Sequence, residues 1–192
     1  MAHWLLLLLT ALPALGQNPL TPENMLPGCP DIVSKSEWGA LSSNCVRPLN
    51  LPVEIVLVSH TASDPCFSPA DCEQQMRLLQ RDHVQIRGFC DIVYNFLIGE
   101  DGLIYEGRGW STQGAHSSAA LNSISLGISF IGNFQNRSPN SRALRAMQSL
   151  LRCGLQHGAL ASQYIIRGEQ GALDFPANRL YGELRKLPRY RE

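Results

Sequence analysis

The sequence predicts an α/β protein in which a central mixed β-sheet is flanked by helices. A nearly continuous run of β-branched and other apolar residues, Val53–Ser59, is typical of a strand buried on both faces. Further strand-like runs alternate along the chain with segments whose apolar residues recur at helical spacing, which favours this fold class. The length of 192 residues allows one domain with a substantial core but is short for two.

The first helix is expected soon after this strand. Ser68 is suited to cap it, Pro69 to occupy its first turn and Asp71 to supply an acidic third residue, and the helix should end at Gly88. Residues three or four apart share one face of a helix, and the apolar ones on that face are expected in the core. The residues with this spacing are Met76, Leu79, His83 and Ile86.

A β-hairpin and a second central strand are expected next. Tyr94–Ile98 and Leu103–Glu106 are short strand-like runs, and the glycine-containing segment between them, Gly99–Gly102, indicates a turn. The run Ser123–Gly132 alternates small and large residues, which indicates another strand in the middle of the sheet.

The last third of the chain is expected to add two helices and one strand. Ser138 and Pro139 repeat the Ser-Pro start of the first helix, so a second long helix should begin there. Tyr164–Arg167 indicates a short strand and Pro176–Leu187 a final helix. The inner faces of these helices should carry Leu144, Met147 and Leu151 in the former, and Leu180, Leu184 and Leu187 in the latter.

Charge and composition exclude some classes of function. The chain has 16 Lys and Arg against 16 Asp and Glu, so its formal net charge is zero. No broad basic field is available to attract nucleic acid, and we expect no nucleic-acid partner. With 44% hydrophobic and 17% charged residues, the chain has the composition of a folded protein.

The N-terminus has the pattern of a secretory signal peptide. Residues 1–16 contain a Leu-rich core, and Ala14 and Gly16 supply the small residues of a cleavage site. The alternative is a membrane anchor, but the apolar run falls short of the roughly 20 residues needed to cross a bilayer. We therefore expect a secreted protein without a membrane span, with residues 17–28 as a loose lead-in and residues 29–192 as the domain.

The cysteines indicate a disulfide framework. An even count of six in an exported chain predicts three disulfides, for which fifteen pairings exist. Cys66 and Cys72 flank a short loop and are a natural local pair. A zinc cluster is the alternative, which the lack of any Cys-x-x-Cys pair disfavours. The other cysteines are Cys29, Cys45, Cys90 and Cys153.

Several polar residues lie where a ligand site is expected. His60 directly follows the buried strand, and open α/β sheets place ligand sites at strand ends. His83 and Arg87 are four apart on one helix, so both heads can point the same way. Tyr94 begins the next strand, and His116 lies in a loop of small residues. A lone strand-end histidine is more often structural, but burying this whole set in a core would be costly, so a cleft is expected.

Six segments together carry a family resemblance. Two long matches, YNFLIGEDG and YEGRGW, are specific. The segments are Val58–Ala62, Arg87–Ile92, Tyr94–Gly99, Ile104–Trp110, Gly114–His116 and Leu126–Gly132. In them the chain resembles the peptidoglycan recognition proteins, especially the short secreted vertebrate type. The resemblance spans roughly Cys29 to Tyr190.

The resemblance implies a fold related to the zinc N-acetylmuramoyl-L-alanine amidases, with a long groove on one face. In such proteins the groove holds the stem peptide of bacterial peptidoglycan together with part of its sugar. The resemblance also implies the disulfides Cys29–Cys153, Cys45–Cys90 and Cys66–Cys72.

A zinc amidase of this kind holds the metal with two histidines and one cysteine and leaves a fourth position for water. His60 matches the first histidine, and Tyr94 matches a tyrosine that helps the chemistry. Glu169, in the stretch GEQG, stands where the second histidine belongs, and Phe175 stands where the cysteine belongs. Losing two of three ligands removes most of the zinc-binding free energy, so we expect neither zinc nor hydrolysis. The alternative is a metal site rebuilt with Glu169 or Asp174.

The same resemblance implies which residues contact the muramyl peptide. Imidazole, phenol and amide groups can pair with the amides and carboxylates of a stem peptide, and Arg87 could grip a carboxylate with two nitrogens. The expected contacts are His60, Thr61, His83, Arg87, Gly88, Phe89, Tyr94, Arg108, His116 and Asn122.

The third residue of the stem peptide is lysine or meso-diaminopimelate, which carries one more carboxylate. In the family, the two residues before the position of Cys90 help to discriminate: Asn-Phe goes with lysine and Gly-Trp with diaminopimelate. Gly88-Phe89 is half of each pattern, and Arg108 offers a cation for the extra carboxylate. We expect a preference for diaminopimelate, or recognition of both.

The leading functional hypothesis is a secreted, non-catalytic protein of innate immunity that binds peptidoglycan and muramyl peptides. Bactericidal activity and storage in secretory granules are further expectations. One alternative is a zinc amidase with altered ligands. Another is a ligand for a host receptor protein with a vestigial groove, for which the altered segment Arg167–Pro176 leaves room.

Overall fold

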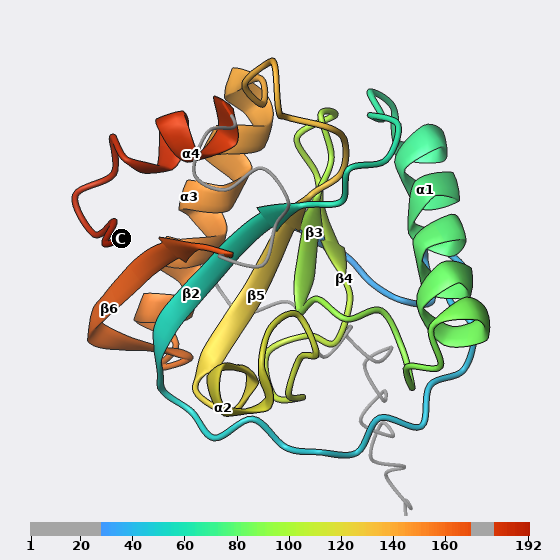
Figure 1. Ribbon diagram of the computed structural model, residues 1–192, viewed down its shortest axis with the longest axis horizontal. Helices are drawn as coiled ribbons and strands as arrows, with labels where there is room; N and C mark the ends of the chain where they lie inside the picture. Colours follow the sequence, from blue (N-terminus) through green and yellow to red (C-terminus); the bar gives the residue numbers. More distant parts are fainter. Residues whose placement is uncertain (1–27, 170–178) are drawn as a thin grey trace, which may run out of the picture.

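The computed structural model describes residues 28–169 and 179–192, which contain one six-stranded sheet (Figure 1). The strand order is β1-β4-β3-β5-β2-β6. Within the described residues β3 and β4 pair antiparallel and the other neighbours pair parallel, so the predicted mixed sheet is confirmed. The strands are β1 (Ile32–Val33), β2 (Val53–His60), β3 (Phe96–Ile98), β4 (Ile104–Glu106), β5 (Ser125–Phe130) and β6 (Leu160–Gly168).

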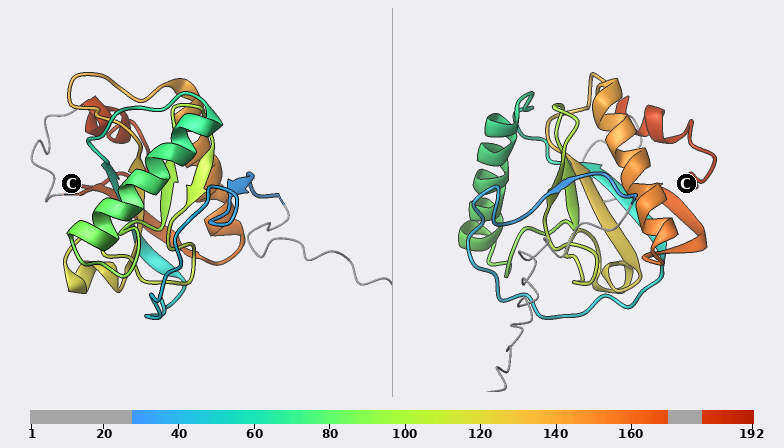
Figure 2. Two further views of the ribbon diagram at one scale, coloured as in Figure 1. Left: turned by 90° about the vertical axis from the view of Figure 1, so that its right-hand side faces the viewer. Right: turned by 180° about the vertical axis from the view of Figure 1, so that it is seen from behind.

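Helices pack on both faces of the sheet (Figure 2). On one face α1 buries Met76 in a cluster with Trp38 and Tyr105. On the other face α3 and α4 enclose the larger cluster, in which Leu150 and Leu180 are fully buried. The helices are α1 (Pro69–Arg81), the π-helical turn η1 (Asp82–Ile86), α2 (Ala119–Asn122), α3 (Ser141–Gln156) and α4 (Arg179–Leu184).

Side chains alternate along β2, so this strand contributes residues to both faces of the sheet. Val56 and Val58 belong to the core on the side of α3. Leu57 and Ser59 therefore point to the opposite face, because successive side chains of a strand alternate. α1 packs on that face beside β3 and β4 (Figure 1), and Leu57 and Ser59 line a hollow instead.

The first helix forms as predicted up to Arg81 and then changes its register. Met76 is fully buried, as expected. From Asp82 the turn is π-helical, and the N–H of Arg87 donates to the carbonyl of Asp82 at 3.0 Å. This wider turn rotates Ile86 away from the core, where it is 78% exposed. The prediction that Ile86 lies in the core is therefore wrong.

The second long helix begins two residues later than predicted. Asn140 caps it, since its Oδ1 accepts the N–H of Ala143 at 3.0 Å, and the helix starts at Ser141. Ser138, which was expected to open the helix, instead donates its hydroxyl to Glu183 at 3.0 Å. The predicted Ser-Pro start is therefore wrong at this position.

Other element boundaries also differ from the prediction. β6 is longer than the predicted run Tyr164–Arg167, and β5 is shorter than Ser123–Gly132. Tyr94 lies two residues before β3 rather than at the start of a strand. α4 ends at Leu184 rather than Leu187. The short elements β1 and α2 were not predicted, because two or four residues carry no readable period.

All three implied disulfides are present. Cys29 is bonded to Cys153, Cys45 to Cys90 and Cys66 to Cys72. The first joins the start of the domain to α3, and the last closes a loop of six residues beside α1. The pairing implied by the resemblance is therefore confirmed.

Asn95 fixes the long loop between β4 and α2 to the sheet. Its side-chain amide donates to the carbonyls of Gly109 and Thr112 at 2.8 and 2.9 Å. Its Oδ1 accepts the N–H of Gly127 on β5 at 2.9 Å. Because Asn95 is fully buried and these bonds use both ends of its amide, the loop that carries His116 has a defined position.

Some predictions fall outside the described residues. These are the signal peptide over residues 1–16, nearly all of the lead-in, and the residues Asp174, Phe175 and Pro176. Within residues 28–169 and 179–192, no helix combines the length and the apolar character needed to span a membrane.

Candidate functional site

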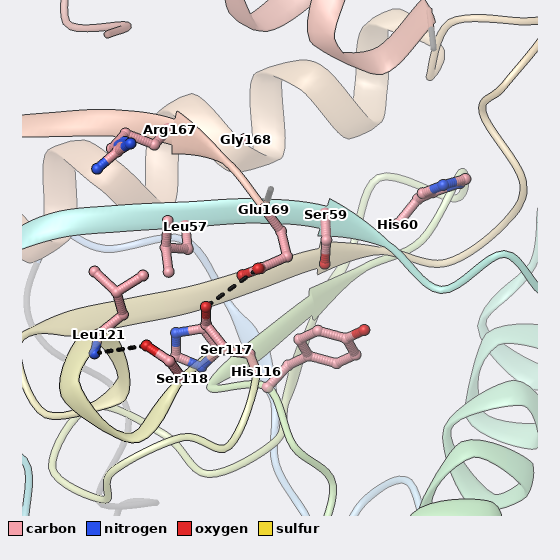
Figure 3. Close-up of a pocket in the computed structure, with 11 residues that line it drawn as sticks. Leu57, Ser59, His60, His116, Ser117, Ser118, Leu121, Arg167, Gly168 and Glu169 are labelled. Atoms are coloured by element: carbon pink, nitrogen blue, oxygen red, sulfur yellow. Dashed lines mark hydrogen bonds between the residues drawn. The ribbon is translucent and has the colours of Figure 1, made fainter. Parts of the chain in front are cut away.

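Two adjoining hollows form a groove on the face of the sheet that α3 does not cover. The larger one, here named the sheet hollow, has a volume of about 680 Å³ and is bordered by β2, β6 and the loop before α2 (Figure 3). The smaller one, the helix hollow, has a volume of about 350 Å³ and lies between η1 and the loop after β2. Tyr94 lines both. The sheet hollow also contains the expected residues His60 and His116, and the helix hollow Thr61, His83 and Arg87.

His60 lies at the end of β2, where the strand leaves the sheet. Its Nδ1 accepts the backbone N–H of Phe134 at 3.0 Å, so the neutral ring carries its proton on Nε2. The side chain is buried and its ring lies beside that of Phe134, with 6.3 Å between centroids. The backbone of the next loop therefore sets both the tautomer and the direction of this imidazole.

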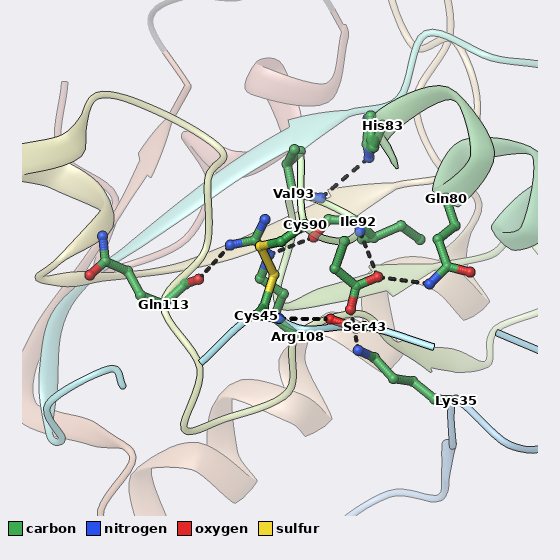
Figure 4. The surroundings of a disulfide bond; sticks show 11 residues. Lys35, Ser43, Cys45, Gln80, His83, Cys90, Ile92, Val93, Arg108 and Gln113 are labelled. Atoms are coloured by element: carbon green, nitrogen blue, oxygen red, sulfur yellow. Dashed lines mark hydrogen bonds and ion pairs between the residues drawn. A yellow bond between two sulfur atoms is a disulfide. The ribbon is translucent and has the colours of Figure 1, made fainter. Parts of the chain in front are cut away.

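His83 lies in the π-helical turn and is 4% exposed. Its Nδ1 accepts the N–H of Val93 at 3.3 Å (Figure 4), so Nε2 carries the proton. Burial lowers the pKa of His83 to about 4, and the positive charges of Arg87 and Arg108 act in the same direction. His83 is therefore a neutral imidazole at physiological pH, able to donate one hydrogen bond.

His116 packs flat against β5. Its Nε2 lies 3.0 Å from the hydroxyl of Ser125, and that hydroxyl donates to the carbonyl of Leu121 at 2.6 Å. The imidazole is therefore the donor to Ser125. A Cβ at Gly127 would overlap the ring, so the bare backbone of glycine makes room for it. Burial lowers the pKa of His116 to about 4, with a further contribution from Arg108.

Arg87 and Thr61 both line the helix hollow. Nε of Arg87 donates to Asp82 at 2.7 Å, and the side chain is 61% exposed, so its remaining donors point into open space. Thr61 Oγ1 accepts the N–H of Gly132 at 2.9 Å and lies 2.8 Å from the hydroxyl of Ser63. Both residues lie where a ligand in the hollow would meet them.

Gly88 and Phe89 lie in neither of these hollows. They line a third hollow of about 600 Å³ beside the Cys45–Cys90 disulfide, which Asn44 also lines (Figure 4 shows the disulfide). Gly88 has a φ of +74°, a backbone conformation that favours glycine. Contact of these two residues with a ligand stays a prediction.

Arg108 lines neither the sheet hollow nor the helix hollow. Nε donates to the carbonyl of Ile92 at 2.7 Å and Nη1 to that of Gln113 at 2.8 Å (Figure 4). Nη2 is buried and has no hydrogen-bond partner in the described part of the chain. Burial lowers the pKa of the guanidinium. The arginine tethers two loops and adds positive charge near His83 and His116, while its predicted contact with a carboxylate stays a prediction.

Asn122 is buried in α2 and also lines neither hollow. Its Oδ1 accepts the N–H of Ser117, and its Nδ2 donates to the carbonyl of Ser117, both at 2.8 Å. These paired bonds hold Ser117 at the rim of the sheet hollow. The structure thus gives Asn122 a positioning role, and direct contact with a ligand stays a prediction.

Sequence reasoning did not assign several residues that line the sheet hollow. Ser59 could have been found, because it lies on the same face of β2 as Leu57. The same alternation places Arg167 and Glu169 on one side of the end of β6. Ser117 and Ser118 carried no signal beyond their closeness to His116. The missed lining residues are Leu57, Ser59, Ser117, Ser118, Leu121 and Arg167.

Two described residues occupy positions where the resemblance places zinc ligands, His60 and Glu169. Nδ1 of His60 is engaged with the backbone of Phe134, and Glu169 accepts the hydroxyl of Ser117 at 3.1 Å. Across residues 28–169 and 179–192, no group of three His, Cys, Asp or Glu side chains could hold a metal ion. A catalytic zinc needs three protein ligands, so the described residues do not fit one.

Comparison with known proteins agrees with this fold. A family model described as N-acetylmuramoyl-L-alanine amidase matches residues 49–179, which defines the class of domain. Peptidoglycan recognition protein 1 of Bos taurus is 50% identical over 165 residues, covering 85% of this chain and 87% of that protein. The chain belongs to the peptidoglycan recognition proteins.

Solved structures of relatives have the same architecture. Peptidoglycan recognition protein-LE, in complex with tracheal cytotoxin, superposes with a TM-score of 0.80 at 39% identity, covering 83% of this chain and 95% of that chain. Human PGRP-IBETAC, in complex with glycosamyl muramyl pentapeptide, superposes with a TM-score of 0.80 at 35% identity, covering 87% of this chain and 100% of that chain.

Proposed function

We propose that this protein binds bacterial peptidoglycan by holding a muramyl peptide in the groove, and that it does not cleave the peptide. The observation that carries the proposal is the meeting of the two hollows at Tyr94, which brings three imidazoles, a phenol and Arg87 to one groove. Two relatives of the same fold were solved in complexes named for tracheal cytotoxin and for a muramyl pentapeptide, which supports the proposal.

The chemistry of the groove suits a stem peptide. Neutral imidazoles such as His83 can donate to peptide carbonyls without carrying a charge, and the phenol of Tyr94 can donate or accept. Arg87 can meet a carboxylate through its remaining nitrogens. A hydrogen bond to a charged group contributes about 1.5–3 kcal/mol, so Arg87→Ala should weaken binding of a peptide carboxylate roughly 10- to 100-fold.

Binding without hydrolysis is supported by the residues at the expected metal positions. Glu169 and Phe175 replace a histidine and a cysteine, and Glu169 accepts a hydrogen bond from Ser117. Without three ligands no metal would polarise the scissile carbonyl or lower the pKa of a bound water. The groove would therefore hold the ligand and release it unchanged.

The proposal extends to the third residue of the stem peptide. Gly88 and Phe89 line the hollow beside the Cys45–Cys90 disulfide, and Arg108 has one buried nitrogen without a hydrogen-bond partner among the described residues. These features favour diaminopimelate, with its extra carboxylate, or recognition of both stem types. Affinities for the two muramyl tripeptides test this, and a clear preference for lysine would contradict it.

We also assign the protein to a secreted, innate-immune role. Three disulfides are typical of proteins that fold in an oxidising compartment, which supports secretion. Bactericidal activity and storage in secretory granules belong to the same proposal. A killing assay on live bacteria and staining of granules with an antibody to this chain test these two points separately.

Calorimetric titration with a muramyl tripeptide, with and without added zinc, tests the proposed function. We expect one binding event whose affinity does not depend on zinc. Zinc-dependent binding together with release of free stem peptide would instead indicate an amidase with altered ligands. Failure to sediment with insoluble peptidoglycan would favour a ligand for a host receptor.

A further inference from the structure

One end of the sheet hollow, next to Arg167, Leu57 and Leu121, is here named the outer end (Figure 3). The arginine at this end has no partner among the described residues. Arg167 lies on β6, opposite Leu57 of β2. It lines the sheet hollow together with Leu57, Ser118 and Leu121 (Figure 3). The residue is half-buried. Over residues 28–169 and 179–192, its guanidinium makes no hydrogen bond, ion pair or ring contact.

The other arginines near the groove are engaged. Arg87 pairs with Asp82 at 2.7 Å, and Arg108 donates to two backbone carbonyls. A half-buried guanidinium has lost part of its hydration, and without a partner this loss is uncompensated. Arg167 therefore lines the sheet hollow with a guanidinium that is available to bind a group from outside the chain.

Glu169 does not neutralise Arg167, although the two lie on the same side of the strand. Its carboxylate accepts the hydroxyl of Ser117 at 3.1 Å, and in Figure 3 it points toward that serine while the guanidinium points away, toward the other end of the hollow. No ion pair joins the two residues. The positive charge at the outer end is thus available to a ligand.

The surroundings of Arg167 suit a ligand that combines an anion with an apolar surface. The side chains of Leu57 and Leu121 provide an apolar floor beside the arginine (Figure 3). The hydroxyl of Ser118 accepts the N–H of Leu121 at 3.4 Å and keeps its own hydrogen to donate. A guanidinium and a hydroxyl can together bind the oxygens of one carboxylate or phosphate group.

We propose that Arg167 binds an anionic oxygen group, carboxylate or phosphate, carried by the cell-wall fragment in the sheet hollow. This inference rests on the proposed function and names a specificity-determining residue for it. The anion has two chemical sources. It is a carboxylate of the stem peptide or a phosphate ester on the sugar, and both present a pair of anionic oxygens that can accept two N–H donors of a guanidinium.

Three synthetic muramyl tripeptides distinguish these sources: one with all peptide carboxylates amidated, one with free carboxylates, and an amidated one that carries a phosphate on the sugar. The dissociation constant of each is measured for the wild-type protein and for Arg167→Gln. Arg145→Gln is the matched control, because Arg145 is exposed on α3 and lies outside the groove. Thermal unfolding of each variant checks that the fold is kept.

We expect the wild-type protein to prefer at least one anionic tripeptide over the neutral one by at least tenfold, because one charge-assisted hydrogen bond from Arg167 contributes about that factor. Arg167→Gln should lower that ratio about tenfold and leave any contribution of Arg87, and Arg145→Gln should keep the full ratio. The fragment that shows the effect identifies the source of the anion. An unchanged ratio in Arg167→Gln would overturn the inference while leaving peptidoglycan binding intact. Absence of binding of all three tripeptides to the wild-type protein would overturn the proposed function and this inference with it.

Discussion

At the scale of single residues, the groove shows how environment decides what one residue type does. His60, His83 and His116 are all held by a partner inside the protein, but by different ones: a backbone N–H for the first two and a serine hydroxyl for the third. Each bond fixes which ring nitrogen carries the proton. The sequence could identify the three histidines, but their tautomers depend on hydrogen-bond partners that only the fold brings near, such as the backbone N–H of Phe134 for His60.

Buried His83 should make the protein less stable as the pH falls from about 6.5 to about 4. Its folded-state pKa is lowered to about 4 from the ordinary 6.5. In this range the unfolded chain binds a proton that the folded protein does not, so the free energy of unfolding decreases on acidification. The contribution of His83 is on the order of 3 kcal/mol. Urea unfolding across this range measures it.

Two variants test whether His83 causes this dependence. In His83→Asn the side-chain oxygen can still accept the N–H of Val93. His157→Asn is the control, because it removes an exposed histidine. His83→Asn should show a shallower dependence of stability on pH, and His157→Asn should follow the wild type. The interpretation fails if His83→Asn keeps the full slope.

The bond between Ser117 and Glu169 should set the shape of the sheet hollow. It ties the loop before α2 to the end of β6 at 3.1 Å. Glu169→Ala should weaken binding of a muramyl tripeptide about tenfold, whereas Glu169→Gln keeps an acceptor oxygen and should retain most of the affinity. Calorimetric titration measures the three proteins.

A double-mutant cycle separates this bond from other effects of the substitutions. If the two residues act through one bond, Ser117→Ala should cost affinity in the wild-type background and little more in Glu169→Ala. Fully additive losses would show that Glu169 acts in another way.

At the scale of elements, the sequence predicts what carries a long period or a strong pattern. The central strand β2, the helix α1 up to Arg81 and the hairpin β3–β4 all appear, although β3 starts two residues later than predicted. The errors have local causes. A π-helical turn rotates Ile86 outward, and Asn140 displaces Ser138 as the cap of α3. The spacing of residues alone shows neither that the helix widens into a π-helical turn nor which of two residues caps α3.

The close packing of β5 against His116 gives a prediction at this scale. Gly127→Ala should displace the His116 ring, because the added Cβ would occupy its place, and binding of a muramyl tripeptide should weaken. Titration together with the NMR signals of the His116 ring measures both effects. In a His116→Ala background the same change should be nearly neutral for binding. Wild-type affinity and an unmoved ring in Gly127→Ala would refute this packing argument.

At the scale of the whole molecule, three disulfides cross-link the domain, and Cys29–Cys153 joins its start to α3. The spacing of the cysteines supports the Cys66–Cys72 pair alone, and the resemblance supplied the other two. The groove is likewise a property of the whole chain: β2, β6, η1 and the loop around Ser117 meet there from distant parts of the sequence. Arg167 could not be assigned to it until the strand order placed β6 beside β2.

The disulfides should differ in how much they stabilise the fold. Cys29–Cys153 closes a loop of 124 residues and Cys66–Cys72 one of 6. From loop entropy in the unfolded chain, replacing both cysteines by alanine should cost about 5 kcal/mol for the first pair and about 2 kcal/mol for the second. Urea unfolding of the two double variants gives the difference. Equal losses would mean that native contacts, and not loop length, decide the effect.

Whether the groove holds its ligand uncut is tested most directly by recovering the ligand after binding. The protein is saturated with a muramyl tripeptide in the presence of equimolar zinc, and the released ligand is analysed by mass spectrometry. We predict full occupancy and a tripeptide recovered intact, with the same result after chelation of zinc. Cleavage of the amide between the lactyl group and the first alanine, lost on chelation, would contradict the assignment.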